Sequence, residues 1–250
     1  MKIYYFGATI HDVDMLYENG FDGNLFLAGV KGDDFVKIAR YMDISKTFKY
    51  MVAIRSYTIS PQYLSAICTS IDEISSGKIE INLLSGWTKE EEKQAGGIIG
   101  DINDLSSKID KSNYMIKFLE TINNMKILRK PEIYVSCTNQ FTFAAAKKHK
   151  ENVILPYSRY KTGEYDIEKS KTIISIGPIF KDYKDYASID IGYAPDDSEF
   201  FTKQDFALFL NKLDNEGFNG VLIYAWPHET ENKKIIEFVK EYTQNKSYGS

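Results

Sequence analysis

Short apolar runs alternate with stretches of helical periodicity along the whole chain. Eight runs have the length and pattern of β-strands, near residues 2–8, 23–28, 49–54, 79–84, 132–136, 152–155, 172–179 and 219–224. Alternating strands and helices predict a parallel sheet. Eight such units in 250 residues match the size of a (β/α)8 TIM barrel, which is the predicted fold.

Four segments between these strands carry apolar residues three and four positions apart, which predicts helices packed on a sheet. The clearest starts at Pro61, a favoured residue of a first helical turn, and ends before Gly77. Its apolar positions are Leu64, Ile67, Cys68, Ile71 and Ile74, and the other three sets are Ile109, Ile116, Leu119 and Ile122; Phe206, Leu208, Phe209 and Leu213; and Ile235, Phe238, Val239 and Tyr242.

Two stretches depart from this pattern. Residues 157–171 are polar and lack an apolar stripe, so the sixth helix is predicted to be eroded or replaced by a loop. Residues 181–201 are irregular and rich in tyrosine. They are interpreted either as a segment that covers the barrel mouth or as a surface loop whose aromatic residues are incidental. Without an internal repeat or a linker, the chain is predicted to form one domain over residues 1–246, followed by a tail at 247–250.

Composition and charge exclude several classes of function. The chain is 43% hydrophobic and 26% charged, with a formal charge of −4 and no Lys/Arg block, so a nucleic-acid partner is not expected. No apolar run reaches the roughly 18 residues of a membrane span. The start of the chain lacks a signal-peptide pattern, and the expected location is cytoplasmic. Cys68 and Cys137 stand in apolar surroundings and are predicted to be buried and reduced.

The stretch around the fourth strand raises the first question about function. This strand carries Asn82 and stops at Ser85, Gly86 and Trp87, and structure alone gives no strong reason for these residues. In a (β/α)8 barrel, active sites form at the carboxyl ends of the strands. A ligand bound at this strand end would explain these residues. Arg55 follows the third strand and belongs to the same set of candidates.

Two of the three histidines also follow strands. His11 comes after the first strand and His228 after the eighth, and these strands are neighbours in a closed barrel. Each histidine could act as a hydrogen-bond donor, a proton carrier or a cation. The alternative interpretation is that both are ordinary polar loop residues.

The segment after the fifth strand has two interpretations. Thr138, Asn139 and Thr142 precede or open a helix, and hydroxyl and amide groups at a helix N-terminus form an anion site or a plain N-cap. No metal-ligand spacing, nucleophile elbow, GxGxxG or Walker pattern occurs, so no metal is expected. A cofactor that brings its own reactivity fits this set of residues better than hydrolytic chemistry.

Four stretches together resemble the bacterial luciferase-like flavin monooxygenases, and most closely their alkanesulfonate monooxygenase group. They are "FKYMVAIRSYTISPQYLSAICTSIDEISSGKIEINLLSGWTKEE" (48–92), "PEIYVSCTNQFTFAAAKKHKENVILP" (131–156), "LDNEGFNGVLIYAWPHETE" (213–231) and, more loosely, "GFDGNLFLAGVKGDDFVKIARYM" (20–42). The resemblance implies a (β/α)8 barrel, reduced FMN (FMNH2) supplied by a partner flavin reductase, O2 activation at the flavin and oxygenation of a small organic substrate. It also implies a homodimer formed through helices near strands two to four, while a deazaflavin is the alternative cofactor.

The resemblance assigns roles residue by residue. Asn82 and Ser85 match polar positions that contact the isoalloxazine ring. The segment with Thr138, Asn139 and Thr142 matches the loop that holds the FMN phosphate. The catalytic candidates are His11 and His228, which match family histidines, together with Arg55 at the end of the third strand.

The departures from the family are also specific. Gly32 stands at the position of the family's active-site cysteine, and Ile109 lies near that of its tyrosine. The large insertion after strand seven is absent, and "TIISIGPIF" has no counterpart of the histidine and arginine on the family's seventh strand. Three hypotheses follow: a working monooxygenase, a non-catalytic flavin- or flavin-adduct-binding protein, and a barrel that acts through an interface without flavin. The two histidines favour the first hypothesis, and the absent lid favours the second.

Overall fold

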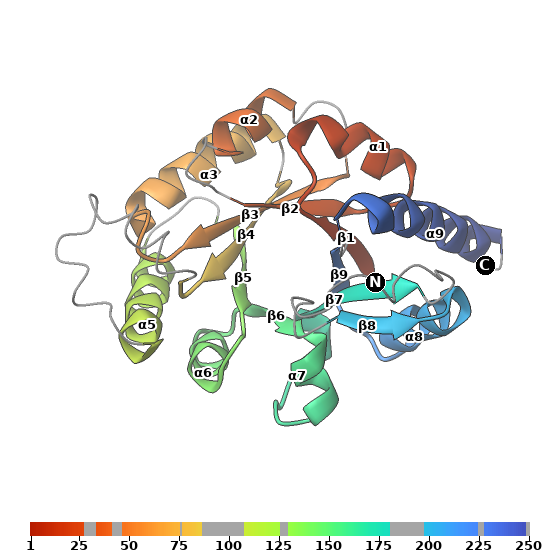
Figure 1. Cartoon of the computed structure of the whole chain (residues 1–250). Helices are drawn as coiled ribbons and strands as arrows, with labels where there is room; N and C mark the ends of the chain where they lie inside the picture. Colours follow the sequence, from red (N-terminus) through yellow and green to blue (C-terminus); the bar gives the residue numbers. More distant parts are fainter. Residues whose placement is uncertain are drawn as a thin grey trace. The chain divides into compact units, whose positions relative to one another are not determined.

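The computed structural model describes residues 1–27, 34–41, 47–75, 77–86, 108–125, 130–180, 198–224 and 228–248 (Figure 1). Strands and helices alternate along these ranges. They are β1 (Lys2–Phe6), η1 (Ile10–Asp12), α1 (Val13–Glu18), β2 (Gly23–Leu27), α2 (Asp34–Tyr41), β3 (Lys49–Arg55), α3 (Pro61–Ser75), β4 (Ile79–Leu84), α5 (Lys108–Asn124), β5 (Glu132–Ser136), α6 (Gln140–His149), β6 (Asn152–Pro156), α7 (Tyr157–Thr162), η3 (Lys169–Lys171), β7 (Thr172–Phe180), β8 (Ser198–Phe201), α8 (Lys203–Asn215), β9 (Gly220–Tyr224) and α9 (His228–Tyr248). No helix within these ranges is long and apolar enough to cross a membrane.

The strand order confirms the predicted fold class. All eight predicted strands are present, in the order β6-β5-β4-β3-β2-β1-β9-β7-β8, and β6 also pairs with β7. This is the sequential parallel order of a (β/α)8 barrel. β8 is an additional short strand that pairs with the end of β7. The prediction of an irregular segment up to residue 201 was therefore wrong for residues 198–201.

The chain divides into two compact units, whose boundaries fall within β2 and β6. The terminal unit comprises residues 1–24 and 155–250, and the central unit comprises residues 25–154.

The central unit places helices on one face of a parallel sheet. β3, β4, β5 and β6 pair in sequence order, and α2, α3 and α6 contact β3, β4 and β5. Most of the buried helical residues are apolar, among them Leu64 and Cys68 of α3 and Phe118 and Leu119 of α5. Because strand side chains alternate between faces, one set of strand residues supplies an aliphatic partner surface for these helices. That set is Val52, Ile54, Ile81, Leu83, Ile133 and Val135, and all of its members are buried.

The other face of the same strands has a different chemistry. The registers Ala53↔Asn82 and Asn82↔Tyr134 place alternate residues of β3, β4 and β5 on it. Its buried members include Glu80, Asn82 and Tyr134, and the half-buried Ser136 also belongs to it. Polar side chains on a buried sheet face need specific partners, so this face is where a site is expected.

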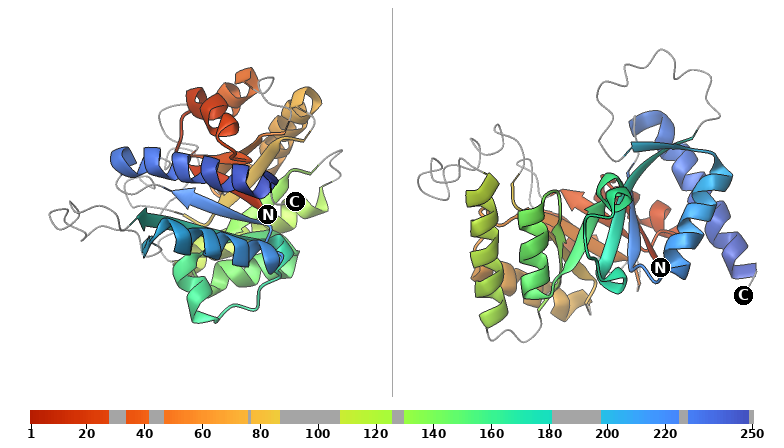
Figure 2. Two further views of the ribbon diagram at one scale, coloured as in Figure 1. Left: turned by 90° about the vertical axis from the view of Figure 1, so that its right-hand side faces the viewer. Right: turned by 90° about the horizontal axis from the view of Figure 1, so that it is seen from below.

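The terminal unit is built on β1, β9, β7 and β8, which pair in parallel in that order. Helices α8 and α9 run beside these strands (Figure 2). Five phenylalanines form an aromatic cluster between the helices and strands of this unit: Phe180, Phe201, Phe206, Phe209 and Phe238. Phe206 is fully buried, and four ring centroids lie 5.1–6.1 Å from its own.

The sixth helix is shortened, as predicted. α7 has six residues and ends at Gly163, which has a positive φ of 67°. This helix lacks an aliphatic stripe, and its tyrosines make the contacts instead. Tyr157 packs edge-on against Phe209 at 5.0 Å, and Tyr160 packs edge-on against Phe218 at 5.6 Å. Aromatic edge contacts of this kind hold a polar segment in place without a conventional apolar face.

Two residues of the predicted helix stripes are exposed. Ile74 is 61% exposed and Leu208 is 60% exposed, so their assignment to the packed faces of α3 and α8 was wrong. Both cysteines are buried free thiols, as predicted. Burial raises the pKa of the Cys68 thiol to about 12, which keeps it protonated at neutral pH.

Candidate functional site

The carboxyl ends of β3 and β4 form the centre of the candidate site in the central unit. Arg55 ends β3 and is 7% exposed, and the following Ser56 and Tyr57 are also buried. The backbone N–H of Ser56 donates to the Leu84 carbonyl at 3.1 Å, so the two strands stay hydrogen-bonded to their ends. Arg55 therefore lies at the end of β3, where the pairing with β4 continues. The sequence placed it directly after this strand.

Asn82 lies on the polar face of β4 and is 3% exposed. Its Oδ1 accepts a hydrogen bond of 2.8 Å from the Ser136 hydroxyl of β5. Within the described ranges its amide nitrogen has no hydrogen-bond partner. The Asn82 side chain as a whole is nearly enclosed, and its amide nitrogen is the polar atom that Ser136 leaves unengaged. The group is therefore suited to donate to an acceptor atom of a ligand.

The residues after Asn82 are covered by two side chains that sequence reasoning did not single out. A Cβ on Gly86 would lie 2.9 Å from Cδ of Lys111 and 3.5 Å from the ring of Tyr57. The stem of Lys111, from α5, and the Tyr57 phenol thus lie directly over Gly86, beside the half-buried Ser85. Gly86 was the indication that the sequence offered of this cover. A glycine after a strand has no side chain and leaves room for a neighbouring group.

The segment after β5 forms a helix cap. Asn139 is the N-cap of α6, and its Oδ1 accepts from the Thr142 backbone N–H at 3.0 Å. The Thr142 hydroxyl donates to the Asn139 carbonyl at 2.9 Å, so both side chains are engaged in the cap. Thr138 is exposed, and its hydroxyl has no partner in the part of the chain that the structure describes. Asn139 and Thr142 therefore form the N-cap, which was one of the two interpretations of this segment. Thr138 and the first N–H groups of α6 are the groups still available to an anion.

The two histidines belong to the terminal unit. His11 lies in η1 and is exposed, whereas His228 is the first residue of α9 and its side chain lies outside the described part. β1 and β9 pair directly, with Phe6 opposite Tyr224, so both histidines follow adjacent strand ends, as predicted. Gly32 lies outside the described residues.

Asn24 is a further buried amide near a strand end of the terminal unit. It is fully buried in β2, and its Nδ2 donates to the Ala8 carbonyl at 3.3 Å. Its Oδ1 has no hydrogen-bond partner among the described residues. Sequence reasoning did not single it out, because one asparagine in a short strand is uninformative without the fold.

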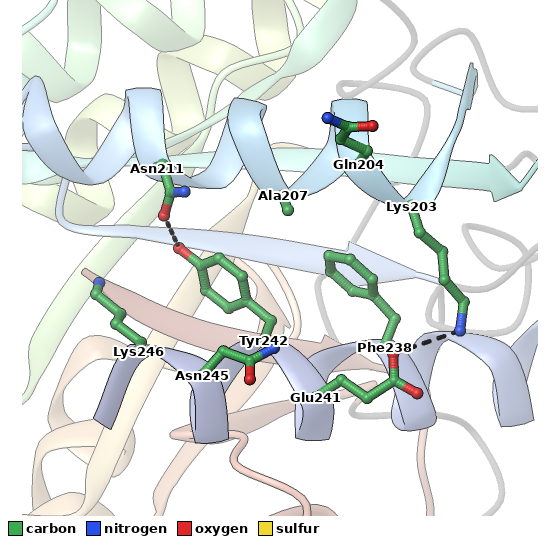
Figure 3. Close-up of a pocket in the computed structure, with 9 residues that line it drawn as sticks. All are labelled: Lys203, Gln204, Ala207, Asn211, Phe238, Glu241, Tyr242, Asn245 and Lys246. Carbon is green, nitrogen blue, oxygen red and sulfur yellow. Dashed lines mark hydrogen bonds and ion pairs between the residues drawn. The ribbon is translucent and has the colours of Figure 1, made fainter. Parts of the chain in front are cut away.

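A separate pocket of about 410 Å³ lies between α8 and α9 (Figure 3). The phenol of Tyr242 donates to Asn211 at 2.8 Å, and Lys203 pairs with Glu241 at 3.5 Å. The lining residues are Lys203, Gln204, Ala207, Asn211, Phe238, Glu241, Tyr242, Asn245 and Lys246. None of the site residues predicted from the sequence belongs to this set.

Comparison with known proteins supports the sequence resemblance. The chain is 29% identical over 89 residues to pyrimidine monooxygenase RutA of Bradyrhizobium sp. (strain BTAi1), and 23% identical over 113 residues to RutA of Caulobacter vibrioides (strain NA1000). These matches cover 36% and 45% of this chain but only 25% and 31% of the relatives. The chain thus spans less than a third of the length of these curated relatives. No protein-family model matches it.

Solved structures share the fold over almost the whole chain. The EDTA monooxygenase EmoA from Chelativorans sp. BNC1 aligns over 98% of this chain and 94% of its own, with a TM-score of 0.72 and 11% identity. Long-chain alkane monooxygenase LadA aligns over 99% and 92%, with a TM-score of 0.70 and 13% identity. The oxygenating constituent of 3,6-diketocamphane monooxygenase from Pseudomonas putida, solved in complex with FMN, aligns over 96% of both chains, with a TM-score of 0.61 and 13% identity.

At these identities the solved structures establish the fold alone, and the RutA matches add similarity in sequence. Neither kind of match singles out the alkanesulfonate group. The chain is thus similar in fold to these monooxygenases over almost its whole length, and similar in sequence to pyrimidine monooxygenase RutA over part of it.

Proposed function

We propose that this chain binds FMN and acts as an FMN-dependent monooxygenase of a small organic substrate. The observation that carries the proposal is the Asn82 amide, which is nearly enclosed at a strand end and has its oxygen engaged by Ser136 and its nitrogen available. An FMN-bound relative with the same fold supports the choice of cofactor. The stretches quoted above resemble the alkanesulfonate group, so alkanesulfonates are the first substrates to test.

The residues of the central unit fit a flavin. Asn82 and Ser85 supply an amide and a hydroxyl for the polar edge of the isoalloxazine ring. Because Asn139 and Thr142 hold the cap of α6, that segment would bind the phosphate mainly through the Thr138 hydroxyl and the first N–H groups of α6. Lys111 and Tyr57 cover the end of β4.

The chemistry would be divided between cofactor and protein. Bound in its reduced form, FMN supplies the activation of O2, and a flavin reductase would deliver it. His11 and His228 are proposed to hold or move protons during turnover, and Arg55 to place a fixed positive charge near the reacting groups. These three are the proposed catalytic residues.

Non-catalytic flavin binding is the second candidate. The observation that favours it is β7, where the apolar and small residues Ile176, Gly177 and Pro178 leave no side chain for acid–base chemistry. The two candidates differ in what they do to bound FMNH2 in air. In a catalyst, His11→Ala and His228→Ala should change the rate of FMNH2 oxidation at unchanged affinity. In a storage protein, both variants should match the wild type in rate.

FMN titration tests the proposal itself. Wild-type protein should quench FMN fluorescence saturably, and photoreduced FMN should also bind. Asn82→Leu should weaken binding by about tenfold, which corresponds to about 1.4 kcal/mol, because the flavin loses a hydrogen-bond donor.

A matched control tests whether FMN binds at Asn82 or in the pocket between α8 and α9. Asn211→Leu removes an amide from the pocket between α8 and α9 and should leave FMN affinity unchanged. Loss of FMN affinity in Asn211→Leu but not in Asn82→Leu would move the site to that pocket. A wild-type protein that binds neither redox state at millimolar FMN contradicts the proposal.

We also propose a homodimer through the central unit. α3 exposes Tyr63 (62%) and Ile74 (61%), which lie eleven residues apart and therefore on one face of the helix, and α2 exposes Val36 (69%). These exposed apolar side chains on adjacent helices are the candidate contacts of such an interface.

Sedimentation at micromolar concentration should show a dimer of the wild-type chain. The double variant Tyr63→Lys/Ile74→Lys should be a monomer, because two charges would lose hydration in the interface. Leu208→Lys places a charge at an equally exposed leucine on α8 and should remain dimeric. A monomeric wild-type chain excludes the dimer.

A further inference from the structure

The Ser136 hydroxyl of β5 contacts the Asn82 side chain of the neighbouring strand, β4. Asn82 is opposite Tyr134 in the β4–β5 register, so Ser136 stands two residues further toward the carboxyl end of β5. Its Oγ donates to Asn82 Oδ1 at 2.8 Å along this diagonal. Side chains at diagonal positions of neighbouring strands are within reach of each other. The hydrogen bond thus links side chains of β4 and β5 on the polar face of the sheet.

This hydrogen bond determines what Asn82 offers to a ligand. An asparagine side chain carries an acceptor oxygen and two N–H donors, and a serine hydroxyl carries one proton to donate. With that proton on Asn82 Oδ1, the N–H groups are the part of the amide left for a partner. A ligand atom at this place must therefore be an acceptor, such as a carbonyl oxygen.

The same bond strengthens the donor. In a chain of hydrogen bonds, donation into a carbonyl polarises the amide, and its N–H groups become better donors. The low exposure of Asn82 reduces competition from water. Loss of the Ser136 hydroxyl would also free the Asn82 side chain to turn.

We propose that Ser136 is a positioning residue that turns Asn82 into a fixed hydrogen-bond donor for a carbonyl oxygen of the flavin ring. The inference rests on the proposed FMN binding and deepens it, because it names the ligand group that this position accepts. Ser136 acts through Asn82 and needs no contact with the flavin.

Two substitutions at residue 136 test this role. Ser136→Ala removes the hydroxyl and should weaken FMN binding by about three- to tenfold, whereas Ser136→Thr keeps the hydroxyl and should restore most of the affinity. The infrared carbonyl bands of bound FMN give a second measurement. They should shift to higher wavenumber and broaden in Ser136→Ala, and remain close to the wild type in Ser136→Thr. Thermal unfolding of each variant checks that it is folded.

The control is Ser65→Ala, which removes a buried hydroxyl from α3 of the same unit. It should change neither FMN affinity nor the carbonyl bands. If the wild type binds FMN and Ser136→Ala matches it in affinity and in band position, the positioning role is overturned while the proposed function stands. If the wild type binds no FMN, both are overturned.

Discussion

Replacement of Phe206 by alanine should lower the free energy of unfolding by about 3–5 kcal/mol, the usual range for a buried aromatic side chain. Phe206 is fully buried at the centre of the aromatic cluster, with the rings of Phe201 and Phe238 centred 5.1 and 5.2 Å from its own. Removing it would leave a cavity that rigid rings close only in part. Urea unfolding followed by circular dichroism measures the effect.

Leu208→Ala is the matched control on the same helix. Leu208 is 60% exposed, so its truncation should change the free energy of unfolding by no more than about 0.5 kcal/mol. Similar losses for Phe206→Ala and Leu208→Ala would show that the aromatic cluster does not stabilise α8 as described.

Gly177→Ala should destabilise the chain by about 1–3 kcal/mol, although alanine is normally preferred to glycine inside a strand. A Cβ at Gly177 would lie 2.4 Å from Cε2 of Tyr224, on the neighbouring β9. The Tyr224 ring would have to move, and it packs edge-on against Phe6 at 6.4 Å. The expected loss therefore comes from overpacking between β7 and β9.

A double-mutant cycle with Tyr224→Ala isolates this clash. Once the ring is gone, Gly177→Ala should cost little or even stabilise the strand. Unfolding midpoints of the four proteins give the coupling free energy. Additive effects of the two substitutions would contradict a steric cause.

Periodicity was sufficient for the strands and for the existence of the helices, but not for every buried side chain. Leu208 lies two positions after Phe206, about 200° around a helix that turns about 100° per residue, and so it faces away from the cluster. Ile74 lies eleven residues after the exposed Tyr63 and shares its face. The three-residue spacing from Ile71 placed Ile74 at the edge of the predicted stripe, and its apolar side chain placed Leu208 in the other, but both are exposed.

The candidate site was predictable where it depends on strand ends. Arg55, Asn82 and Ser85 stand at the ends of β3 and β4 because a barrel presents its carboxyl strand ends together. The cap of α6 was also predictable, since it joins residues three positions apart.

The contacts that give the site its chemistry were not predictable in this way. Ser136 meets Asn82 only through the β4–β5 register, and hydrophobic pattern does not specify the diagonal partner of a single residue. Lys111 reaches Gly86 from α5, which is a tertiary contact without a local pattern.

The direct pairing of β1 with β9 constrains how the chain acquires its structure during synthesis. Lys2 lies opposite Gly220 and Phe6 opposite Tyr224, so β1 obtains this neighbour only after Gly220 and the rest of β9 have been made. At about 5–20 residues per second, the wait on the ribosome is about 10–40 s. Until then one edge of β1 exposes unpaired backbone groups, which can pair with other chains. Nascent-chain aggregation should therefore be sensitive to translation speed and to chaperones that bind the emerging N-terminal segment.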